Sequence, residues 1–260
     1  TQDEDGETIC VEDVLIPAKD GYDLMKKSIE YFEKLDMYSI VMTQDFDQTE
    51  LWMSKSNRIL PGIQTGIHDF EKNKVSDLVN SNKVVVIGEI VTQYEGLPAD
   101  AKELDTIWKL AVKHDIPTGI HLAGPGAPTS NFMTSYGNPL TLEPVLKKHP
   151  KLRIYIMHGG WPYLEETVSL LRQYPNVYID ISWISWQMPR QLYYEYLEKL
   201  ILYGFEKRIM FGTDQVAWPK AIEIAVNGIE EASFLTDGQK KNIFYNNAMR
   251  FFRFAKGKFD

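Results

Sequence analysis

The sequence predicts an α/β protein, a (β/α)8 TIM barrel whose first strand is missing from the chain, so that seven strands are visible. Three observations predict it. Seven short apolar segments alternate with helical patterns, as in repeated strand–helix units. Most of these segments are nearly continuous apolar runs, which is typical of parallel strands buried on both faces. Polar residues stand at the ends of many segments, which favours a barrel with a site built from all its loops.

The expected elements follow one another regularly from residue 22 onward. The strands are predicted at Ser39–Thr43, Ile59–Gln64, Val84–Ile87, Thr118–Leu122, Arg153–Met157, Val177–Ile181 and Arg208–Phe211. Helices are predicted at 22–36, 69–80, 100–114, 140–149, 164–173, 189–203 and 220–233, with a last one from Thr236. Capping-box patterns mark two helix starts, Asp100 with Glu103 and Thr236 with Gln239. No linker interrupts the pattern, so residues 1–260 are expected to form one domain, with 1–21 as an irregular N-terminal segment.

Composition excludes several classes of protein. A net charge of −8 without a Lys/Arg cluster argues against a nucleic-acid partner. No run of 18 or more apolar residues is present, so no membrane span is expected. The single cysteine, Cys10, excludes an internal disulfide. The absence of an internal disulfide favours a cytoplasmic location. The start at Thr1 keeps open that the chain is exported and has lost a signal segment.

The histidines differ in their sequence context. His114 and His149 stand at predicted helix ends, where the helix dipole explains them, and His68 is best explained as the cap of a following helix. His121 and His158 instead follow apolar strands, in GIHLAG and IMHGGWP, and Asp214 follows the last strand in RIMFGTD. Imidazole and carboxylate groups at one rim are suitable ligands for a catalytic divalent metal that activates water.

Other residues at strand ends are candidates for supporting roles. Glu89, in VVVIGEI, is interpreted with equal weight as a metal ligand, a base, a partner for a substrate cation, or an acceptor for His121. Asp180, in VYIDIS, is expected to be structural or to support a ligand. Four tryptophans follow the last three strands. Three of them, Trp161, Trp183 and Trp218, are predicted to line a substrate pocket, although such residues are more often core.

These strand ends, together with the terminal segment IFYNNAMRFF, resemble the amidohydrolase-related family of the amidohydrolase superfamily. That family includes metal-dependent decarboxylases, lactone hydrolases and other hydrolases. The resemblance runs from about Tyr22 to the C-terminus, and the combination of MHGG with FGTD carries most of it.

The resemblance implies a barrel with one divalent metal ion at its rim, expected to be zinc. His121 would be a metal ligand, and Asp214 would be both a ligand and the proton acceptor for metal-bound water. His158 would polarise the substrate or act as acid and base. Glu89 stands where the family often carries an acidic residue, which adds it to the metal ligands.

One part of the family pattern is missing. The family's first strand carries a His-x-His pair that supplies two metal ligands, yet no histidine precedes His68 here. Either this strand precedes Thr1 in the natural protein, or the metal site is broken. The first alternative is favoured because His121, His158 and Asp214 are all retained. Without that strand, an open seam is expected between the first and last visible strands.

Three functions follow from this reading. The leading hypothesis is a metal-dependent hydrolase of a small-molecule amide, ester or lactone, with Asp214 as base and His158 stabilising the oxyanion. The second is a metal-dependent non-oxidative decarboxylase of an aromatic or muconate-like acid. The third is a non-catalytic barrel that binds a ligand or partner. Few basic residues stand at strand ends, although Arg190 is placed to approach, so a substrate with several carboxylates is disfavoured.

Aromatic residues also raise the question of self-association. The Tyr193, Tyr194 and Tyr196 run and the Phe251, Phe252 and Phe254 tail would suit the surface of a homo-oligomer. Both groups are more often ordinary packing.

Overall fold

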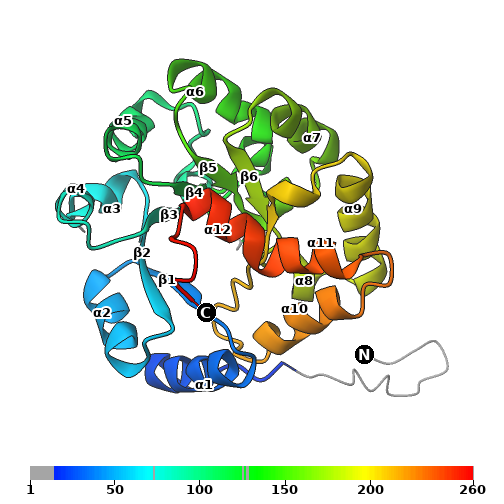
Figure 1. Cartoon of the computed structure of the whole chain (residues 1–260). Helices are drawn as coiled ribbons and strands as arrows, with labels where there is room; N and C mark the ends of the chain where they lie inside the picture. The colour runs from blue at the N-terminus through cyan, green and yellow to red at the C-terminus, as the bar shows by residue number, and fades with distance from the viewer. Residues whose placement is uncertain (1–14, 73, 125, 127–128, 260) are drawn as a thin grey trace.

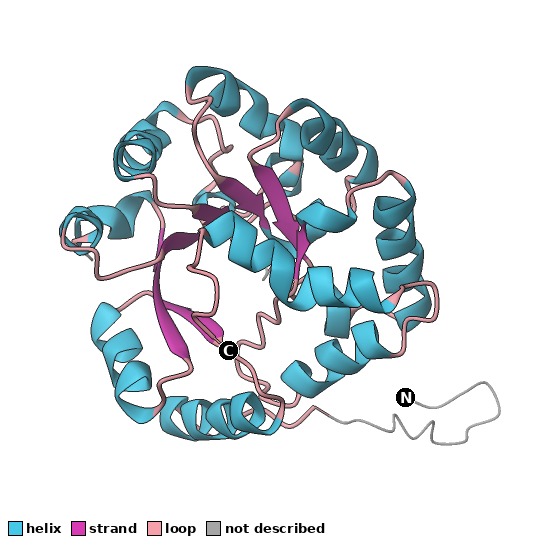
Figure 2. Cartoon of the chain, in the orientation of Figure 1, coloured by secondary structure: helices cyan, strands magenta, loops and turns pink. Residues whose placement is uncertain are grey.

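Seven parallel strands curl around a common centre, and helices cover their outer side (Figures 1 and 2). The computed structural model describes residues 15–72, 74–124, 126 and 129–259. Each strand is hydrogen-bonded to the next in chain order, from β1 to β7. The strands are β1 (Ser39–Thr43), β2 (Ile59–Thr65), β3 (Val86–Ile90), β4 (Thr118–Ile120), β5 (Ile154–Ile156), β6 (Val177–Asp180) and β7 (Ile209–Met210).

Helices connect these strands along the outside. The α-helices are α1 (Gly21–Lys34), α2 (Phe46–Lys55), α3 (Ile67–Lys72), α4 (Val75–Asn80), α5 (Asp105–His114), α6 (Glu143–Lys148), α7 (Leu164–Gln173), α8 (Ile184–Gln187), α9 (Arg190–Leu202), α10 (Ala221–Glu230), α11 (Asp237–Lys241) and α12 (Asn247–Phe252). Short 3-10 turns are η1 (Thr92–Glu95), η2 (Lys102–Leu104), η3 (Thr134–Gly137), η4 (Pro139–Leu142), η5 (Met157–Gly160) and η6 (Glu206–Arg208), and the π-helical turn η7 (Asn242–Asn246) links α11 to α12.

Large side chains from odd-numbered strands fill the inside of the curled sheet. Met42 of β1, Val86 of β3 and Tyr155 of β5 pack in one cluster. Two even-numbered strands carry glycine beside them: a β carbon on Gly62 of β2 would lie 2.6 Å from Met42 Cγ, and one on Gly119 of β4 would lie 2.4 Å from the Tyr155 ring, whereas β6 adds Tyr178 to the cluster. This division of large and small side chains between alternate strands is how a barrel interior fills without voids.

The end of the barrel opposite the strand carboxyl ends is closed by α12. Phe251 packs edge-on against Tyr155, with ring centroids 5.6 Å apart, and against Tyr178. Arg153, just before β5, donates to the Phe251 carbonyl and to Asp115. Figure 1 shows α12 crossing the centre of the barrel. Any site therefore lies at the other end.

The sheet has an open seam, as expected from the sequence. In the described part of the chain, β1 pairs with β2 and β7 pairs with β6, and the two outer strands are not neighbours. All five residues of β1 are half-buried, whereas β4 and β5 are buried throughout. The segment before α1 passes the loop after β7, because Ala18 N donates to the Ala217 carbonyl at 2.7 Å.

Several element predictions need correction. The strand predicted at Val84–Ile87 lies at Val86–Ile90, so Glu89 is inside it. Helix α2 was not predicted, because only Thr49 and Trp52 are buried in it and its apolar pattern is weak. The helix predicted at 69–80 is two helices, α3 and α4. The predictions for residues 1–14 fall outside the described residues.

The two predicted capping boxes had different outcomes. The Thr236–Gln239 box forms with both of its hydrogen bonds. The Asp100–Glu103 box does not, because the 3-10 turn η2 precedes α5 and delays the α-helix to Asp105.

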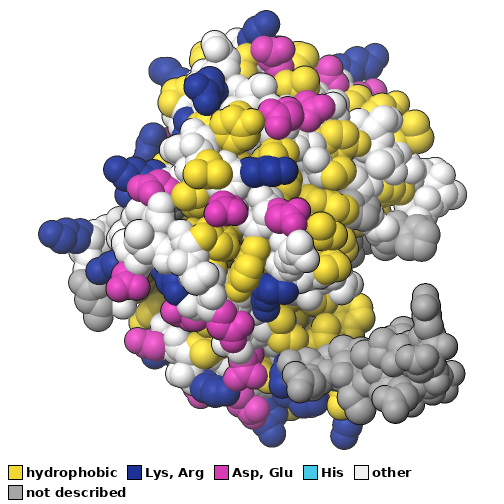
Figure 3. Space-filling view, turned by 90° about the vertical axis from the view of Figure 1, so that its right-hand side faces the viewer, with side chains coloured by type: hydrophobic (Ala, Val, Ile, Leu, Met, Phe, Trp, Pro, Cys, Tyr) yellow, Lys and Arg dark blue, Asp and Glu magenta, His cyan; other side chains and the backbone are white. Residues whose placement is uncertain are grey.

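The surface gives little support to the aromatic groups as an oligomer interface. Tyr193, Tyr196 and Phe251 are buried inside the chain, so they are core. Figure 3 shows hydrophobic side chains interspersed with charged ones over one side of the barrel. In the described residues no helix is long and apolar enough to cross a membrane.

Candidate metal and catalytic site

The candidate site is built at the carboxyl ends of neighbouring strands. Glu89 is the fourth residue of β3, and His121 directly follows β4. His158 follows β5 in the turn η5, Asp180 ends β6, and Asp214 lies in the loop after β7. Because parallel strands present their carboxyl ends at one rim, residues far apart in the chain converge there.

Three of these side chains are in direct contact. Glu89 Oε1 lies 2.6 Å from His121 Nδ1, which in turn lies 2.9 Å from His158 Nε2. His158 Nε2 is also 3.5 Å from Glu89 Oε1. Within the described residues, ligand atoms of Glu89, His121 and His158 all lie within 4.8 Å of one another. Two imidazoles and a carboxylate are a donor set that divalent transition metals accept.

Three residues at or beside the site have an unusual backbone conformation. His158, Trp183 and Asp214 have φ values of 59°, 60° and 45°, in the left-handed region that side chains with a β carbon avoid. Such conformations cluster at functional sites because the surrounding structure must hold them. Two glycines continue the turn after His158, and a β carbon on Gly160 would lie 2.4 Å from Thr167 Oγ1. The MHGG sequence is therefore the local requirement of this turn.

His158 is held from its far side by β6. Asp180 Oδ1 accepts the His158 backbone N–H at 3.0 Å and the Ser182 hydroxyl at 2.6 Å. Ser182 Oγ lies 3.0 Å from His158 Nδ1. His158 and Asp180 are only 2% and 6% exposed, so this network is shielded from water. The expectation that Asp180 plays a supporting role agrees with these contacts.

Burial and mutual hydrogen bonds shift the pKa values of Glu89, His121 and His158. Burial raises the pKa of Glu89, but hydrogen bonds with His121 and His158 outweigh it and hold that pKa well below its usual range. Burial lowers the pKa of His121, and the Glu89 contact opposes it only in part. Burial also lowers the pKa of His158, but Glu89 and the nearby Asp214 and Asp180 charges overcome this and raise it to about 9.

Asp214 belongs to the site electrostatically. Burial, followed by the Glu89 charge, raises the pKa of Asp214 to about 6, and His158 counteracts part of this. In the described residues, the group with ligand atoms within 4.8 Å consists of Glu89, His121 and His158, and Asp214 is not part of it. The structure therefore brings Glu89, His121 and His158 into contact, with Asp214 beside them.

Aromatic rings flank the imidazoles. Trp183 lies beside His158, with ring centroids 6.4 Å apart, and Trp161 donates its backbone N–H to the His158 carbonyl at 3.1 Å. Trp218 packs 5.9 Å from Trp186, further along the rim. Two rings that were not predicted to be near the site, Tyr94 and Phe132, have their centroids 4.9 and 6.3 Å from that of His121.

Two other sequence expectations are corrected or refined. Arg190 does not approach the site: it donates to the Ser185 and Ile224 carbonyls and lies over the Tyr193 and Tyr194 rings. Ser182 was missed because a serine after a strand looks like a turn residue. Ser182 lies in the turn after β6, which ends at Asp180, so the alternation of a strand does not predict the contact.

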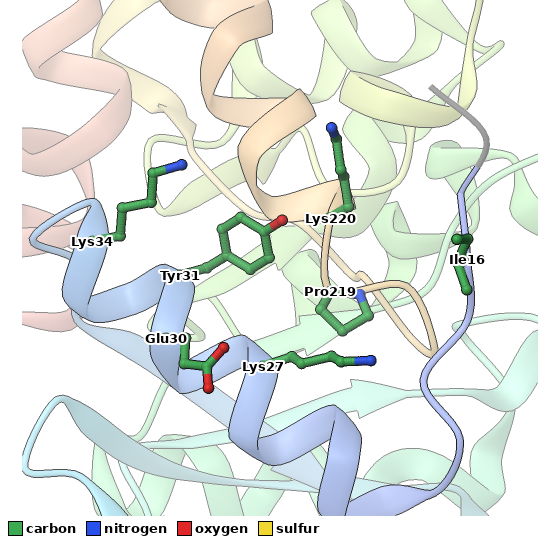
Figure 4. Close-up of a pocket in the computed structure, with 7 residues that line it drawn as sticks. All are labelled: Ile16, Lys27, Glu30, Tyr31, Lys34, Pro219 and Lys220. Carbon is green, nitrogen blue, oxygen red and sulfur yellow. The ribbon is translucent and has the colours of Figure 1, made fainter. Parts of the chain in front are cut away.

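A cavity on the outer wall is separate from this site. It has a volume of about 400 Å³ and is lined by Ile16, Lys27, Glu30, Tyr31, Lys34, Pro219 and Lys220. Figure 4 shows residues of α1 facing the start of α10 across it. Lys27 is paired with Asp23 at 2.8 Å and Lys34 with Glu223 at 2.6 Å. No residue of the candidate site lines this cavity, so the chemistry is not located here.

Comparison with known proteins gives the family and the fold. A family model described as "Amidohydrolase" matches residues 28–254. A curated relative, protein fluG of Emericella nidulans, is 25% identical over 116 residues, which cover 45% of this chain and 13% of that protein. The chain thus matches about an eighth of the length of this relative.

Two solved structures share the architecture. A probable 2-pyrone-4,6-dicarboxylic acid hydrolase from Acinetobacter baumannii, with citric acid bound, has a TM-score of 0.66 at 12% identity, over 88% of this chain and 89% of that one. A 5-carboxyvanillate decarboxylase from Novosphingobium aromaticivorans, with manganese bound, has a TM-score of 0.55 at 18% identity, over 80% and 69% of the two chains. At these identities the likeness shows the fold alone.

Proposed function

Because the chain belongs to the amidohydrolase family, we propose that it is a metal-dependent hydrolase of a small-molecule amide, ester or lactone. The observation that carries the proposal is the convergence of Glu89, His121 and His158 at the carboxyl ends of adjacent strands. Metal-assisted hydrolysis of a carbonyl compound uses a cation, a proton acceptor for the attacking water and a group that stabilises the negative charge on the carbonyl oxygen. The rim offers residues for each of these roles.

The donor set fits a metal ion. His121 Nε2 is buried and has no hydrogen-bond partner in the described structure, and Nδ1 of the same ring lies against Glu89. A buried nitrogen without a partner is costly, and a cation or a water would satisfy it. We assign His121, Glu89 and Asp214 as the residues that hold one divalent ion, with zinc as the expected metal because imidazole and carboxylate suit it. When bound, such an ion polarises a carbonyl oxygen and lowers the pKa of bound water.

Asp214 and His158 are assigned opposite proton-transfer roles. Asp214, with a pKa raised to about 6, is ionised at neutral pH yet close enough to neutrality to accept a proton readily. His158, with a pKa raised to about 9, keeps its proton and can donate a hydrogen bond to a developing oxyanion. Two titratable groups whose surroundings separate their pKa values in this way are typical of an acid–base pair.

The rings around the site favour a planar, ring-bearing substrate. Trp183 lies beside His158, and Tyr94 and Phe132 lie beside His121, all in edge-on contact, so aromatic rings adjoin both imidazoles. We assign Trp161, Trp183 and Trp218 to substrate binding, with the two newly found rings as further wall residues. Rigid aromatic surfaces bind planar groups at low conformational cost.

The second candidate function is metal-dependent decarboxylation of an aromatic or muconate-like acid. The aromatic walls favour it, and a decarboxylase of aromatic acids shares the fold. It would use the same residues to break the C–C bond to a carboxylate instead of the C–N or C–O bond of an acyl group. A third function, ligand or partner binding without catalysis, predicts that the full-length protein holds no metal and that its function survives Asp214→Asn.

A substrate screen with matched variants tests these alternatives. Aryl esters, amides, lactones and hydroxybenzoates are incubated with metal-loaded protein, and acid release is distinguished from carbon dioxide release. His121→Ala and Asp214→Asn are expected to abolish turnover while circular dichroism stays native. The exposed Glu103→Gln serves as the matched acidic control. Wild-type rates in either site variant would overturn the assignment.

A further inference from the structure

Ser182 sits between a buried carboxylate and the candidate catalytic imidazole. Its hydroxyl lies 2.6 Å from Asp180 Oδ1 and 3.0 Å from His158 Nδ1, and its own carbonyl lies 3.3 Å from the same nitrogen. Ser182 is 2% exposed, so water does not compete for these contacts. The three groups form a continuous chain from Asp180 to His158.

The chemistry of the donors fixes where the protons lie. Asp180, when ionised, only accepts hydrogen bonds, so the Ser182 hydroxyl donates its single proton to Oδ1. The Ser182 oxygen can then only accept from His158 Nδ1, and the Ser182 carbonyl also only accepts. Both acceptors therefore require a proton on Nδ1. In every charge state Nε2 is the nitrogen that faces Glu89 and His121.

Asp180 also fixes the backbone that carries this ring. The same Oδ1 accepts the backbone N–H groups of His158 and Ser182, both at 3.0 Å. His158 has a φ of 59°, a conformation that needs outside support. Asp180 Oδ1 thus stabilises the turn at His158 directly, and it orients the His158 ring through the Ser182 hydroxyl.

We propose that Ser182 is a positioning residue that, together with Asp180, locks His158 in the form that presents Nε2 to the site. Its purpose rests on the proposed function, in which His158 donates a hydrogen bond to the developing oxyanion. Loss of partners that orient a site histidine lowers activity about 10–100-fold.

The test compares three variants by nitrogen–proton NMR of histidine-labelled, metal-free full chain, with the His158 signals assigned by their loss in His158→Gln. In Ser182→Ala the Nδ1–H keeps only the 3.3 Å carbonyl contact, so its exchange with water is expected to accelerate at least about tenfold. Ser182→Thr keeps a hydroxyl and should preserve the wild-type signal. The matched control is Ser185→Ala, because Ser185 is equally buried and its hydroxyl has no partner in the described structure.

The outcomes separate this inference from the proposed function. A Ser182→Ala spectrum identical to that of Ser185→Ala would overturn it, as would a proton on Nε2 instead of Nδ1 in neutral His158. If Ser182→Ala does not fold, Ser182→Cys, with a weaker donor of similar shape, gives the same comparison. The signal is read without metal or substrate, so a wild-type protein without turnover would count against the hydrolase alone. With a substrate in hand, kcat should fall about 10–100-fold in Ser182→Ala with little change in KM.

Discussion

His121 Nδ1 lies 2.6 Å from Glu89 Oε1, with 6% and 15% of the two side chains exposed. The contact joins residues that are 32 positions apart, at the ends of β3 and β4. In the absence of a cation the two groups share a proton, and the pKa of Glu89 is held low by that contact. A metal ion bound through Glu89 Oε1 would have to displace this shared proton, so metal binding at that atom and proton release are linked.

Glu89→Gln is expected to abolish metal binding and to lower the free energy of unfolding of the metal-free chain by about 1–3 kcal/mol, because a buried ring nitrogen loses its charged partner. Metal content after dialysis and urea unfolding measure the two effects. Glu103→Gln, which changes an exposed acid, should alter neither. Retention of a full equivalent of metal by Glu89→Gln would remove Glu89 from the ligands.

Asp214→Asn is expected to stabilise the metal-free chain at pH 8 while it abolishes turnover. The folded pKa of about 6 lies above the ordinary value of 3.8, so the stabilisation from this carboxyl is fully present below about pH 3.8 and is lost as pH rises through 6. Removing the charge should therefore raise the free energy of unfolding by about 1–3 kcal/mol at pH 8. The gain should shrink as the pH is lowered to 5. An equal gain at both pH values would show that the charge is not its cause.

For His158→Gln the stabilisation is lost with rising pH as well, but the variant should differ from wild type at low pH instead of high pH. The folded pKa of about 9 lies above the ordinary value of 6.5, so the stabilisation is fully present below pH 6.5 and is lost as pH rises through 9. The variant should lose about 2–3 kcal/mol relative to wild type at pH 6, and much less at pH 10. Urea unfolding at the two pH values measures the difference. His68→Gln, which removes an exposed imidazole, controls for the loss of a histidine as such.

Much of this arrangement could be predicted because it depends on local patterns. Continuous apolar runs located β1 to the residue, and polar residues after such runs located His121 and His158. The seam was also predictable, since seven strands cannot close a barrel that needs eight. The position of β3 was less certain because Gly88 and Glu89 are unlike strand residues, yet burial and pairing with β4 keep them in it.

Contacts between distant loops could not be predicted. Tyr94 and Phe132 come from different connections and meet only in the folded barrel, with ring centroids 5.0 Å apart. Arg190 was expected at the rim, but carbonyls of α8 and α10 hold it on the outside. The position of the Arg190 side chain depends on how these helices pack, which a single sequence does not specify. Ser182 could not be predicted either, because it lies in the turn after β6 and meets His158 only in the folded barrel.

Trp183→Ala is expected to raise KM for a ring-bearing substrate about tenfold or more, since the ring beside His158 would be lost. Trp183→Phe keeps a flat surface and should retain most of the affinity. Trp52→Phe is a suitable control because Trp52 is 8% exposed and packs in a different cluster, against α1. Equal KM values in wild type and Trp183→Ala would remove this ring from the substrate site. The comparison applies to hydrolysis and decarboxylation alike.

The open seam leads to the final prediction. Among the described residues, β1 pairs with β2 alone and is only half-buried, and the segment before α1 lies beside the loop after β7, where Ala18 N donates to the Ala217 carbonyl. A parallel strand upstream of that segment would fit between β7 and β1 as a right-handed strand–helix unit, and its carboxyl end would reach the rim next to Asp214. Metal content is measured on this chain and on a version extended at its N-terminus. Near one equivalent in the extended form only would show that the added strand supplies missing ligands. No metal in either form would favour a barrel that binds a ligand or partner without catalysis.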